Sequence, residues 1–258
     1  MIKNRNGEPL HISRLFPNVV TIIGLCAGLS AIRFALVEKW ELAVGFIVIA
    51  SLLDAVDGRL ARILNSTSEF GAQLDSLSDF FNFGVAPPLI LYLWSTHDVK
   101  GFGWALVLFF AICCAVRLAR FNISLGEEPE APWEDRFFVG IPAPGGALLA
   151  VFPMILTFEF GERFTSLFLV DSYNYLPMAI IVYGLLLAAG MASRIPTYSL
   201  KKVKIRPESA APVLLIIGIM AISAIIEPWI TLSIVGVLYL ISLPLGIINY
   251  YIIRRSPN

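Results

Sequence analysis

Apolar residues form long stretches that recur about every 30 residues along the chain, separated by shorter polar segments. Each stretch is close to the roughly 20 residues that a helix needs to cross about 30 Å of hydrocarbon. This pattern predicts a bundle of eight membrane-spanning helices rather than a barrel. The helices are expected at residues 16–37, 41–63, 70–95, 102–122, 139–160, 172–193, 210–226 and 228–251.

The polar segments divide the chain into four parts. Residues 1–15 form an N-terminal segment, whose stretch Leu10–Leu15 could form a short helix on the membrane surface or stay irregular. Residues 16–193 hold a six-helix core, and residues 194–209 form a basic loop. That loop could attract anionic lipid or act only as a topology signal. Residues 210–258 are expected to form a C-terminal transmembrane hairpin and tail, which looks like an addition to the core.

Composition supports a membrane protein. Hydrophobic residues make up 57% of the chain, charged residues 15%, and the mean hydropathy is +0.79, which is too apolar for a water-soluble globule of this size. The expected class is an all-α polytopic membrane protein. The net charge is zero, so the composition gives no indication of nucleic-acid binding. Cys26, Cys113 and Cys114 lie within apolar stretches without metal-type spacing and are expected in the core.

The basic residues are distributed unevenly between the two sets of helix ends. Only Arg33, Lys39, Lys100 and Arg163 fall at one set, whereas the other fifteen of the nineteen Lys and Arg residues fall at the opposite set. Cytoplasmic loops carry the excess of positive charge in membrane proteins. Both termini and the loops after the second, fourth and sixth helices are therefore expected in the cytoplasm, with the protein in the cell (inner, cytoplasmic) membrane.

Four aspartates interrupt the apolar pattern. Asp54 and Asp57 lie near the end of the second predicted helix, and Asp75 and Asp79 lie near the start of the third. Spacings of three and four place each pair on one helix face. A symmetric hairpin centred near residue 66 would place Asp54 opposite Asp79 and Asp57 opposite Asp75.

The segment between the two pairs reads as a turn. It spans Leu64 to Glu69, and Ser66 and Glu69 stand at the spacing of a capping box for the start of the third helix. The two helices are therefore expected to form an antiparallel hairpin, with all four aspartates at a similar depth in the membrane.

Ionised carboxylates inside a membrane cost several kcal/mol unless they pair or bind a cation. Salt bridges to Arg59 and Arg62 are one explanation, but two arginines cannot neutralise four aspartates. Divalent cations can, and an all-oxygen site suits magnesium or manganese better than zinc. An ion-coupled carrier is an alternative from a different class. Against it, the four aspartates cluster near one face rather than at the midplane between two repeats.

The residues of the hairpin form the pattern Asp54-x2-Asp57-Gly58-x2-Ala61-Arg62-x8-Gly71-x3-Asp75-x3-Asp79. This pattern resembles the full signature of the CDP-alcohol phosphotransferase family. The resemblance implies a six-helix membrane core, usually a homodimer, which holds two divalent cations in a cavity open to the cytoplasm. It further implies that Asp54, Asp57 and Asp75 are metal ligands, and that Asp79 is both a metal-side residue and the general base.

The same resemblance implies a binding site for the CDP group. Upstream of the hairpin, Pro17-Asn18-x2-Thr21 is similar to the first-helix segment of the family, where Asn18 and Thr21 would reach the nucleotide. The implied CDP-binding residues are Asn18, Thr21, Asp54, Gly58, Ala61, Arg62 and Gly71. In this chemistry a hydroxyl attacks the lipid-side phosphate and CMP leaves, so no covalent enzyme intermediate is needed. His11 and His97 lie outside the predicted helices and are interpreted as bystanders.

Three later segments, residues 117–122, 138–144 and 193–202, resemble the phosphatidylserine synthase branch of the family. This resemblance implies CDP-diacylglycerol and L-serine as substrates. Arg117 and Arg120 are one turn apart, an arrangement suited to a carboxylate or phosphate, and Phe121 and Asn122 follow them. Serine carries a carboxylate, so these four residues are the expected serine site. The arginines could also be topology anchors, or could bind glycerol 3-phosphate or inositol phosphate, which sister branches use.

Overall fold

A computed structural model describes residues 16–64, 68–124, 137–170, 173–198 and 210–255. The first half is helical: α1 (Phe16–Leu36), α2 (Trp40–Ile63), α3 (Glu69–Asp79), a π-helix η2 (Phe80–Val85), α4 (Ala86–Leu91), a second π-helix η3 (Tyr92–Thr96) and α5 (Phe102–Ser124).

The second half mixes helices with short strands. They are β1 (Phe137–Val139), α6 (Ala143–Ala150), α7 (Phe152–Phe160), α8 (Glu162–Thr165), a 3-10 turn η5 (Ser166–Phe168), β2 (Leu169–Val170), β3 (Tyr173–Asn174), α9 (Leu176–Ala192), β4 (Pro196–Tyr198), α10 (Ala210–Ile226) and α11 (Pro228–Arg255).

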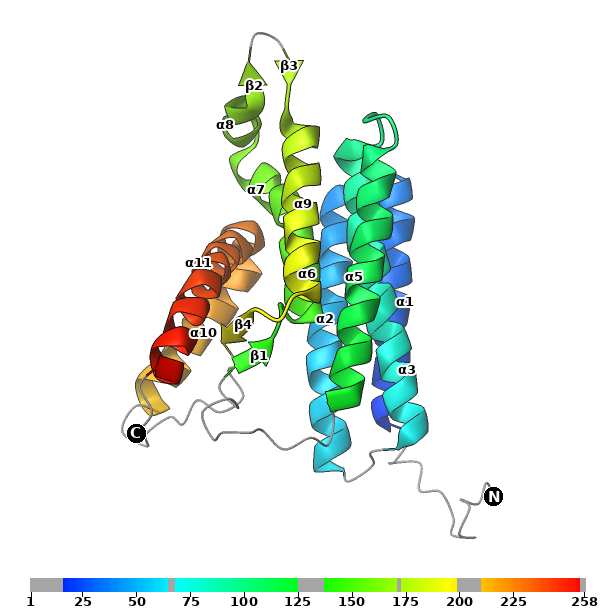
Figure 1. Ribbon diagram of the computed structural model, residues 1–258, viewed down its shortest axis with the longest axis vertical. Helices are drawn as coiled ribbons and strands as arrows, with labels where there is room; N and C mark the ends of the chain where they lie inside the picture. Colours follow the sequence, from blue (N-terminus) through cyan, green and yellow to red (C-terminus); the bar gives the residue numbers. More distant parts are fainter. Residues whose placement is uncertain (1–15, 65–67, 125–136, 171–172, 199–209, 256–258) are drawn as a thin grey trace.

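Helices α1, α2, α5 and α9 run up and down roughly the same axis, and α10 and α11 lean away from it (Figure 1). The end of α2, the start of α3, the end of α5 and the strands β1 and β4 all lie toward the lower end of the molecule, with the start of α1 (Figure 1). Helix α1 packs along α2, α5 packs against α9, and α11 packs against α7 and β4. The ends of α2 and α3 that carry the aspartates therefore lie at the same end of the bundle as the end of α5 and strand β4.

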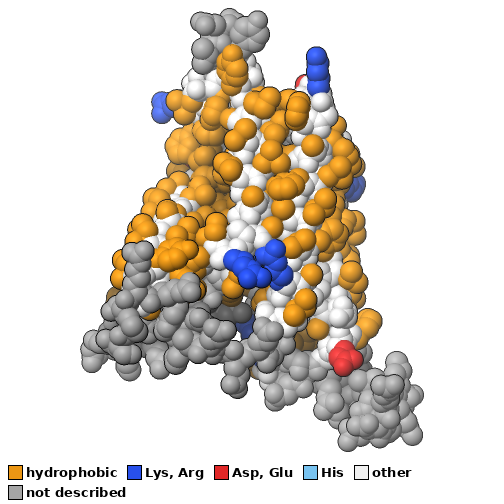
Figure 2. All heavy atoms as spheres, in the orientation of Figure 1, with side chains coloured by type: hydrophobic (Ala, Val, Ile, Leu, Met, Phe, Trp, Pro, Cys, Tyr) orange, Lys and Arg blue, Asp and Glu red, His pale blue; other side chains and the backbone are white. Residues whose placement is uncertain are grey.

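The surface of this bundle is apolar. Figure 2 shows hydrophobic side chains over most of the height of the visible face, with a patch of Lys and Arg toward the lower end. On α10, Leu214 and Leu215 are 68% and 65% exposed, which fits a lipid-facing surface and not an aqueous one.

Within the described part of the chain, four helical stretches are long and apolar enough to cross a membrane: Phe16–Leu36, Phe102–Ser124, Ala143–Phe160 and Pro228–Ile253. Leu176–Ala192 and Ala211–Ile226 are shorter apolar helices. A mostly helical protein with several candidate membrane spans is confirmed, with short strands that were not predicted, while the count of eight spans stays a prediction.

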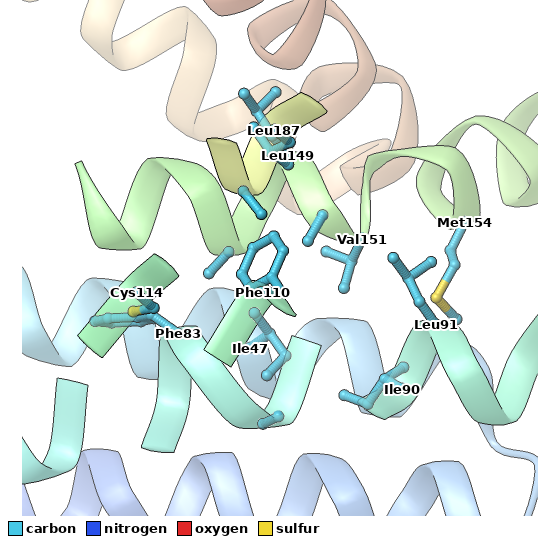
Figure 3. Packing of buried hydrophobic residues seen from close by; sticks show 14 of the residues in the cluster. Ile47, Phe83, Ile90, Leu91, Phe110, Cys114, Leu149, Val151, Met154 and Leu187 are labelled. Atoms are coloured by element: carbon cyan, nitrogen blue, oxygen red, sulfur yellow. The ribbon is translucent and has the colours of Figure 1, made fainter. Parts of the chain in front are cut away.

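Side chains from α2, η2, α4, α5, α6, α7 and α9 form one buried core. Ile47, Phe83, Ile90 and Phe110 are fully buried in it (Figure 3). Because lipid gives helices little hydrophobic reason to associate, close packing of this kind is what holds a membrane bundle together. Cys113 and Cys114 are buried as predicted, but the prediction for Cys26 was wrong, because Cys26 lies on the exposed side of α1.

The third predicted helix, residues 70–95, is not uniform. It begins as α3 and then passes through η2, α4 and η3, so two π-helical segments flank the short α4. Pro87 and Pro88 lie in the first turn of α4, and proline has no amide hydrogen for the regular ladder. π-Helical turns are frequent at functional sites, and η2 begins directly after Asp79.

The fifth and sixth predicted helices, residues 139–160 and 172–193, begin later than expected. Val139 belongs to β1, which pairs antiparallel with β4, and the helix that follows is divided into α6 and α7 at Val151, with Pro153 in the first turn of α7. The sixth begins at Leu176, because Tyr173–Asn174 pairs with Leu169–Val170 as a hairpin. Apolar residues fit either strand or helix, so hydropathy alone could not separate these short strands from the helices.

Candidate active site

The aspartate hairpin is closed at the start of α3 by a side-chain cap. The amide of Gly71 donates a 3.0 Å hydrogen bond to Oγ of Ser68. The sequence predicted this cap at Ser66, which lies outside the described residues; that prediction was wrong, because the cap is Ser68, two residues later, and Glu69 is the first residue of the helix. Ser68 satisfies one of the amide groups that the first turn of a helix leaves without a partner.

Three of the four aspartates converge. Asp54, Asp57 and Asp75 each present a carboxylate oxygen, and these oxygens lie within 4.8 Å of one another. The fourth, Asp79, lies within hydrogen-bonding reach of Asp54. The symmetric hairpin therefore has the predicted geometry, with Asp54 opposite Asp79.

The cluster leaves negative charge without a partner. Asp57 is only 4% exposed, and its Oδ1 has no hydrogen-bond partner among the described residues. Arg59 and Arg62 form no ion pair with the aspartates across the same part of the chain. A buried carboxylate oxygen of this kind, in an all-oxygen donor set, fits a divalent cation such as Mg²⁺ or Mn²⁺.

Thr21 holds one of these carboxylates in place. Its Oγ1 donates a 2.7 Å hydrogen bond to Oδ2 of Asp57. The sequence placed Thr21 at the nucleotide, whereas in the structure its hydroxyl is engaged with a candidate metal ligand. Residues that orient metal ligands in this way act on metal affinity without touching the metal.

Two residues that the sequence analysis missed support Thr21 from behind. Oγ of Ser78 donates to the carbonyl oxygen of Thr21 at 3.4 Å, and Nδ2 of Asn82 donates to Oγ of Ser78 at 3.2 Å. Asn82 lies so close to α1 that a Cβ at Gly28 would come 2.0 Å from its Oδ1. Their signal in the sequence was a pair of polar residues four apart in an apolar helix, which the aspartates overshadowed.

The predicted CDP-binding residues lie at two places near the cluster. A Cβ at Gly71 would be 2.9 Å from Oδ1 of Asn18, so the start of α3 approaches α1 closely there. Gly58 is the opposite case, because no described atom lies within 4 Å of where its Cβ would be. Ala61 and Arg62 follow Gly58 one turn later on the same side of α2, and the Arg62 side chain is exposed.

The predicted serine-binding residues are spread over the end of α5. Arg117 is within electrostatic range of two of the aspartates, Asp79 and Asp54. Arg120 donates through Nη1 to the carbonyl oxygen of Ala192 at the end of α9.

Phe121 and Asn122 lie about one turn beyond Arg117, toward the end of α5. Asn122 donates to Oγ of Ser76 at 3.0 Å, and Phe121 is 40% exposed. The structure therefore brings Arg117 to the aspartate cluster, while Arg120 and Asn122 are hydrogen-bonded to neighbouring helices.

Two of the synthase-like segments meet in space. The amide of Gly140 donates to the carbonyl oxygen of Ile195 at 2.8 Å, and Oγ1 of Thr197 donates to the carbonyl oxygen of Gly140 at 2.8 Å. Gly140 has a φ of +76°, a conformation that glycine adopts without strain. This pairing could not be predicted from the sequence, because the two segments lie more than fifty residues apart.

Comparison with known proteins agrees with this geometry. Residues 14–190 match the family model described as CDP-alcohol phosphatidyltransferase, and residues 209–244 match a second one, CDP-alcohol phosphatidyltransferase 2.

Individual relatives extend the comparison over most of the chain. A CDP-diacylglycerol–serine O-phosphatidyltransferase of Mycobacterium tuberculosis is 35% identical over 256 residues, which covers 99% of this chain and 85% of the relative. Proteins of the same name from Helicobacter pylori and Bacillus subtilis are 37% and 35% identical, over 76% and 56% of this chain and 77% and 76% of their own lengths. The chain therefore belongs to the CDP-alcohol phosphatidyltransferase family, whose signature its aspartate hairpin carries.

Proposed function

We propose that this protein transfers the phosphatidyl group of CDP-diacylglycerol to the hydroxyl of L-serine, giving phosphatidylserine and CMP. The observation that carries the proposal is the convergence of Asp54, Asp57 and Asp75 beside Asp79 and Arg117. The names of the relatives support serine as the acceptor.

The aspartates are the proposed ligands of two divalent cations, Mg²⁺ or Mn²⁺. When bound, these cations would neutralise charge on the phosphoryl oxygens and on the departing CMP. Asp54, Asp57, Asp75 and Asp79 would hold them, and Thr21 would keep the Asp57 carboxylate oriented through its 2.7 Å hydrogen bond.

Asp79 is the proposed general base. It accepts the proton of the acceptor hydroxyl, whose oxygen then forms a bond to the lipid-side phosphorus. The bond from that phosphorus to the bridging oxygen breaks, and CMP leaves with the electron pair. Arg117 supplies positive charge next to Asp79, where an acceptor carboxylate can be held.

The proposed CDP-binding and serine-binding roles are assigned from where the residues lie in the fold. Asn18 and Gly71, where α3 approaches α1, and Gly58, Ala61 and Arg62 on α2, would bind the CDP group together with Thr21 and Asp54. Arg120, Phe121 and Asn122 would border the serine site with Arg117. We place the protein in the cell membrane with its active site toward the cytoplasm, an orientation that the predicted charge asymmetry supports. The homodimer is proposed from the family resemblance alone.

The direct test is an acceptor assay with the purified full chain. We expect labelled serine to be transferred to CDP-diacylglycerol with Mg²⁺ or Mn²⁺, and transfer to stop when a chelator is added. Glycerol 3-phosphate and inositol phosphate are tested in parallel, because Arg117 and Arg120 could also bind a phosphate. CMP release with one of these acceptors alone would refute serine, and no release with any acceptor would favour the carrier hypothesis.

A larger side chain at Gly58 tests the position of the nucleotide. Because no described atom lies within 4 Å of the Cβ position, Gly58→Leu is expected to fold normally and to obstruct the CDP group. We expect the KM for CDP-diacylglycerol to rise at least about 10-fold, the effect of a poorly accommodated side chain.

Gly45→Leu is the matched control. Gly45 lies in the same helix and also has open space at its Cβ position, but it is near the opposite end of α2. An unchanged KM in the Gly58 variant, or an equal rise in both variants, would move the nucleotide away from this face.

A further inference from the structure

The C-terminal hairpin is packed onto the catalytic core instead of standing apart from it. Helix α11 contacts α7 and β4, and Figure 1 shows α10 and α11 beside α7 and β4. Trp229, Leu232, Tyr239, Leu240 and Leu243 pack against the buried core. Of these side chains, Tyr239 carries a hydroxyl at its tip.

The hydroxyl of Tyr239 is buried and has no hydrogen-bond partner within the described ranges. It reaches deep into the bundle, where a Cβ at Gly145 of α6 would come 2.7 Å from it. A buried tyrosine hydroxyl almost always finds a partner, so one without a partner calls for an explanation.

A second orphan donor lies within electrostatic range of this hydroxyl. Nε of Arg117 is also buried and has no hydrogen-bond partner in the part of the chain described. The guanidinium of Arg117 interacts electrostatically with Tyr239, and also with Asp79 and Asp54. Two donors without acceptors, next to the proposed base, form a place where an anionic acceptor group would satisfy both.

We propose that Tyr239 completes the acceptor site, and that its hydroxyl and the guanidinium of Arg117 together bind the carboxylate of the acceptor alcohol. This inference rests on the proposed function, since it takes serine as the acceptor. It assigns the hairpin a role in substrate selection: α11 supplies a substrate-binding side chain that the six-helix core lacks. A carboxylate has lone pairs enough to accept from both donors at once.

The test removes only the hydroxyl. In Tyr239→Phe, the KM for serine is expected to rise at least about 10-fold, the cost of losing a hydrogen bond to a charged group, while the KM for CDP-diacylglycerol stays within about 2-fold. Tyr251→Phe is the matched control, because Tyr251 lies on the same helix but is 52% exposed. It is expected to leave both constants unchanged.

Gly145→Ala provides an independent route to the same site. Its methyl group would displace the Tyr239 ring, so its effect on the serine KM should resemble that of Tyr239→Phe. Because both variants disturb one contact, the double variant should show much less than the sum of the two effects. Additive effects would mean that Gly145 and Tyr239 act separately.

The outcomes separate this inference from the function on which it rests. If the unmodified protein uses serine and Tyr239→Phe leaves its KM unchanged, or raises both KM values equally, the acceptor role of Tyr239 is overturned and the proposed function stands. If the unmodified protein does not use serine, the proposed acceptor and this site are both wrong.

Discussion

Asp79→Asn is expected to lower kcat by at least about 1,000-fold while leaving the fold intact. Asparagine has nearly the same shape as aspartate, so it preserves packing at the end of α3. It cannot accept the proton of the acceptor hydroxyl, and it weakens the proposed metal site at the same time. CMP release by the purified variant, compared with the unmodified protein at saturating substrates and metal, measures the effect.

The matched control for this variant is Asp98→Asn. Asp98 lies at the opposite end of the bundle, where its side chain is 87% exposed and pairs with His97. It should retain full activity. Near-normal turnover of the Asp79 variant would remove Asp79 from the role of base.

Asp57→Asn is expected to lower turnover by at least about 100-fold and to raise the metal concentration needed for half-maximal activity. The substitution removes the negative charge from a side chain whose Oδ1 is buried without a partner among the residues described here. Titration of CMP release with Mn²⁺ measures both quantities in one experiment.

Thr21→Val separates orientation of this ligand from binding of the nucleotide. Valine cannot donate the 2.7 Å hydrogen bond to Asp57, so the metal requirement should rise by about 10- to 100-fold with little change in turnover at saturating metal. A rise in the KM for CDP-diacylglycerol alone would instead support the nucleotide contact expected from the sequence.

For the Asp57→Asn variant, an unchanged metal requirement would exclude Asp57 as a ligand.

The sequence predicted the aspartate hairpin well because its signals are local. Asp54 and Asp57 stand three residues apart, Asp75 and Asp79 four apart, and the hairpin between them is short, so helix geometry alone determines which side chains meet. Regular periodicity likewise located most helix boundaries within a few residues.

The features that the sequence did not predict depend on contacts between distant segments. The pairing of β1 with β4 joins Phe138 to Thr197, and the position of Tyr239 depends on how α11 packs against the core. The hydrogen bond from Thr21 to Asp57 depends on how α1 packs against α2. None of these contacts produces a periodic pattern in the sequence, because each joins residues that are far apart along the chain.

The order in which the chain is synthesised gives the β1–β4 pair a further consequence. All four aspartates and Arg117 precede β1 in the chain, so the reactive centre can assemble while the ribosome is still producing the second half. Strand β4 and helix α11 come last, and Asn249 then fastens α11 to Tyr198 through a 2.9 Å hydrogen bond. During biogenesis the proposed metal-binding hairpin would therefore be complete before α11, which carries the tyrosine proposed to bind the acceptor, is synthesised.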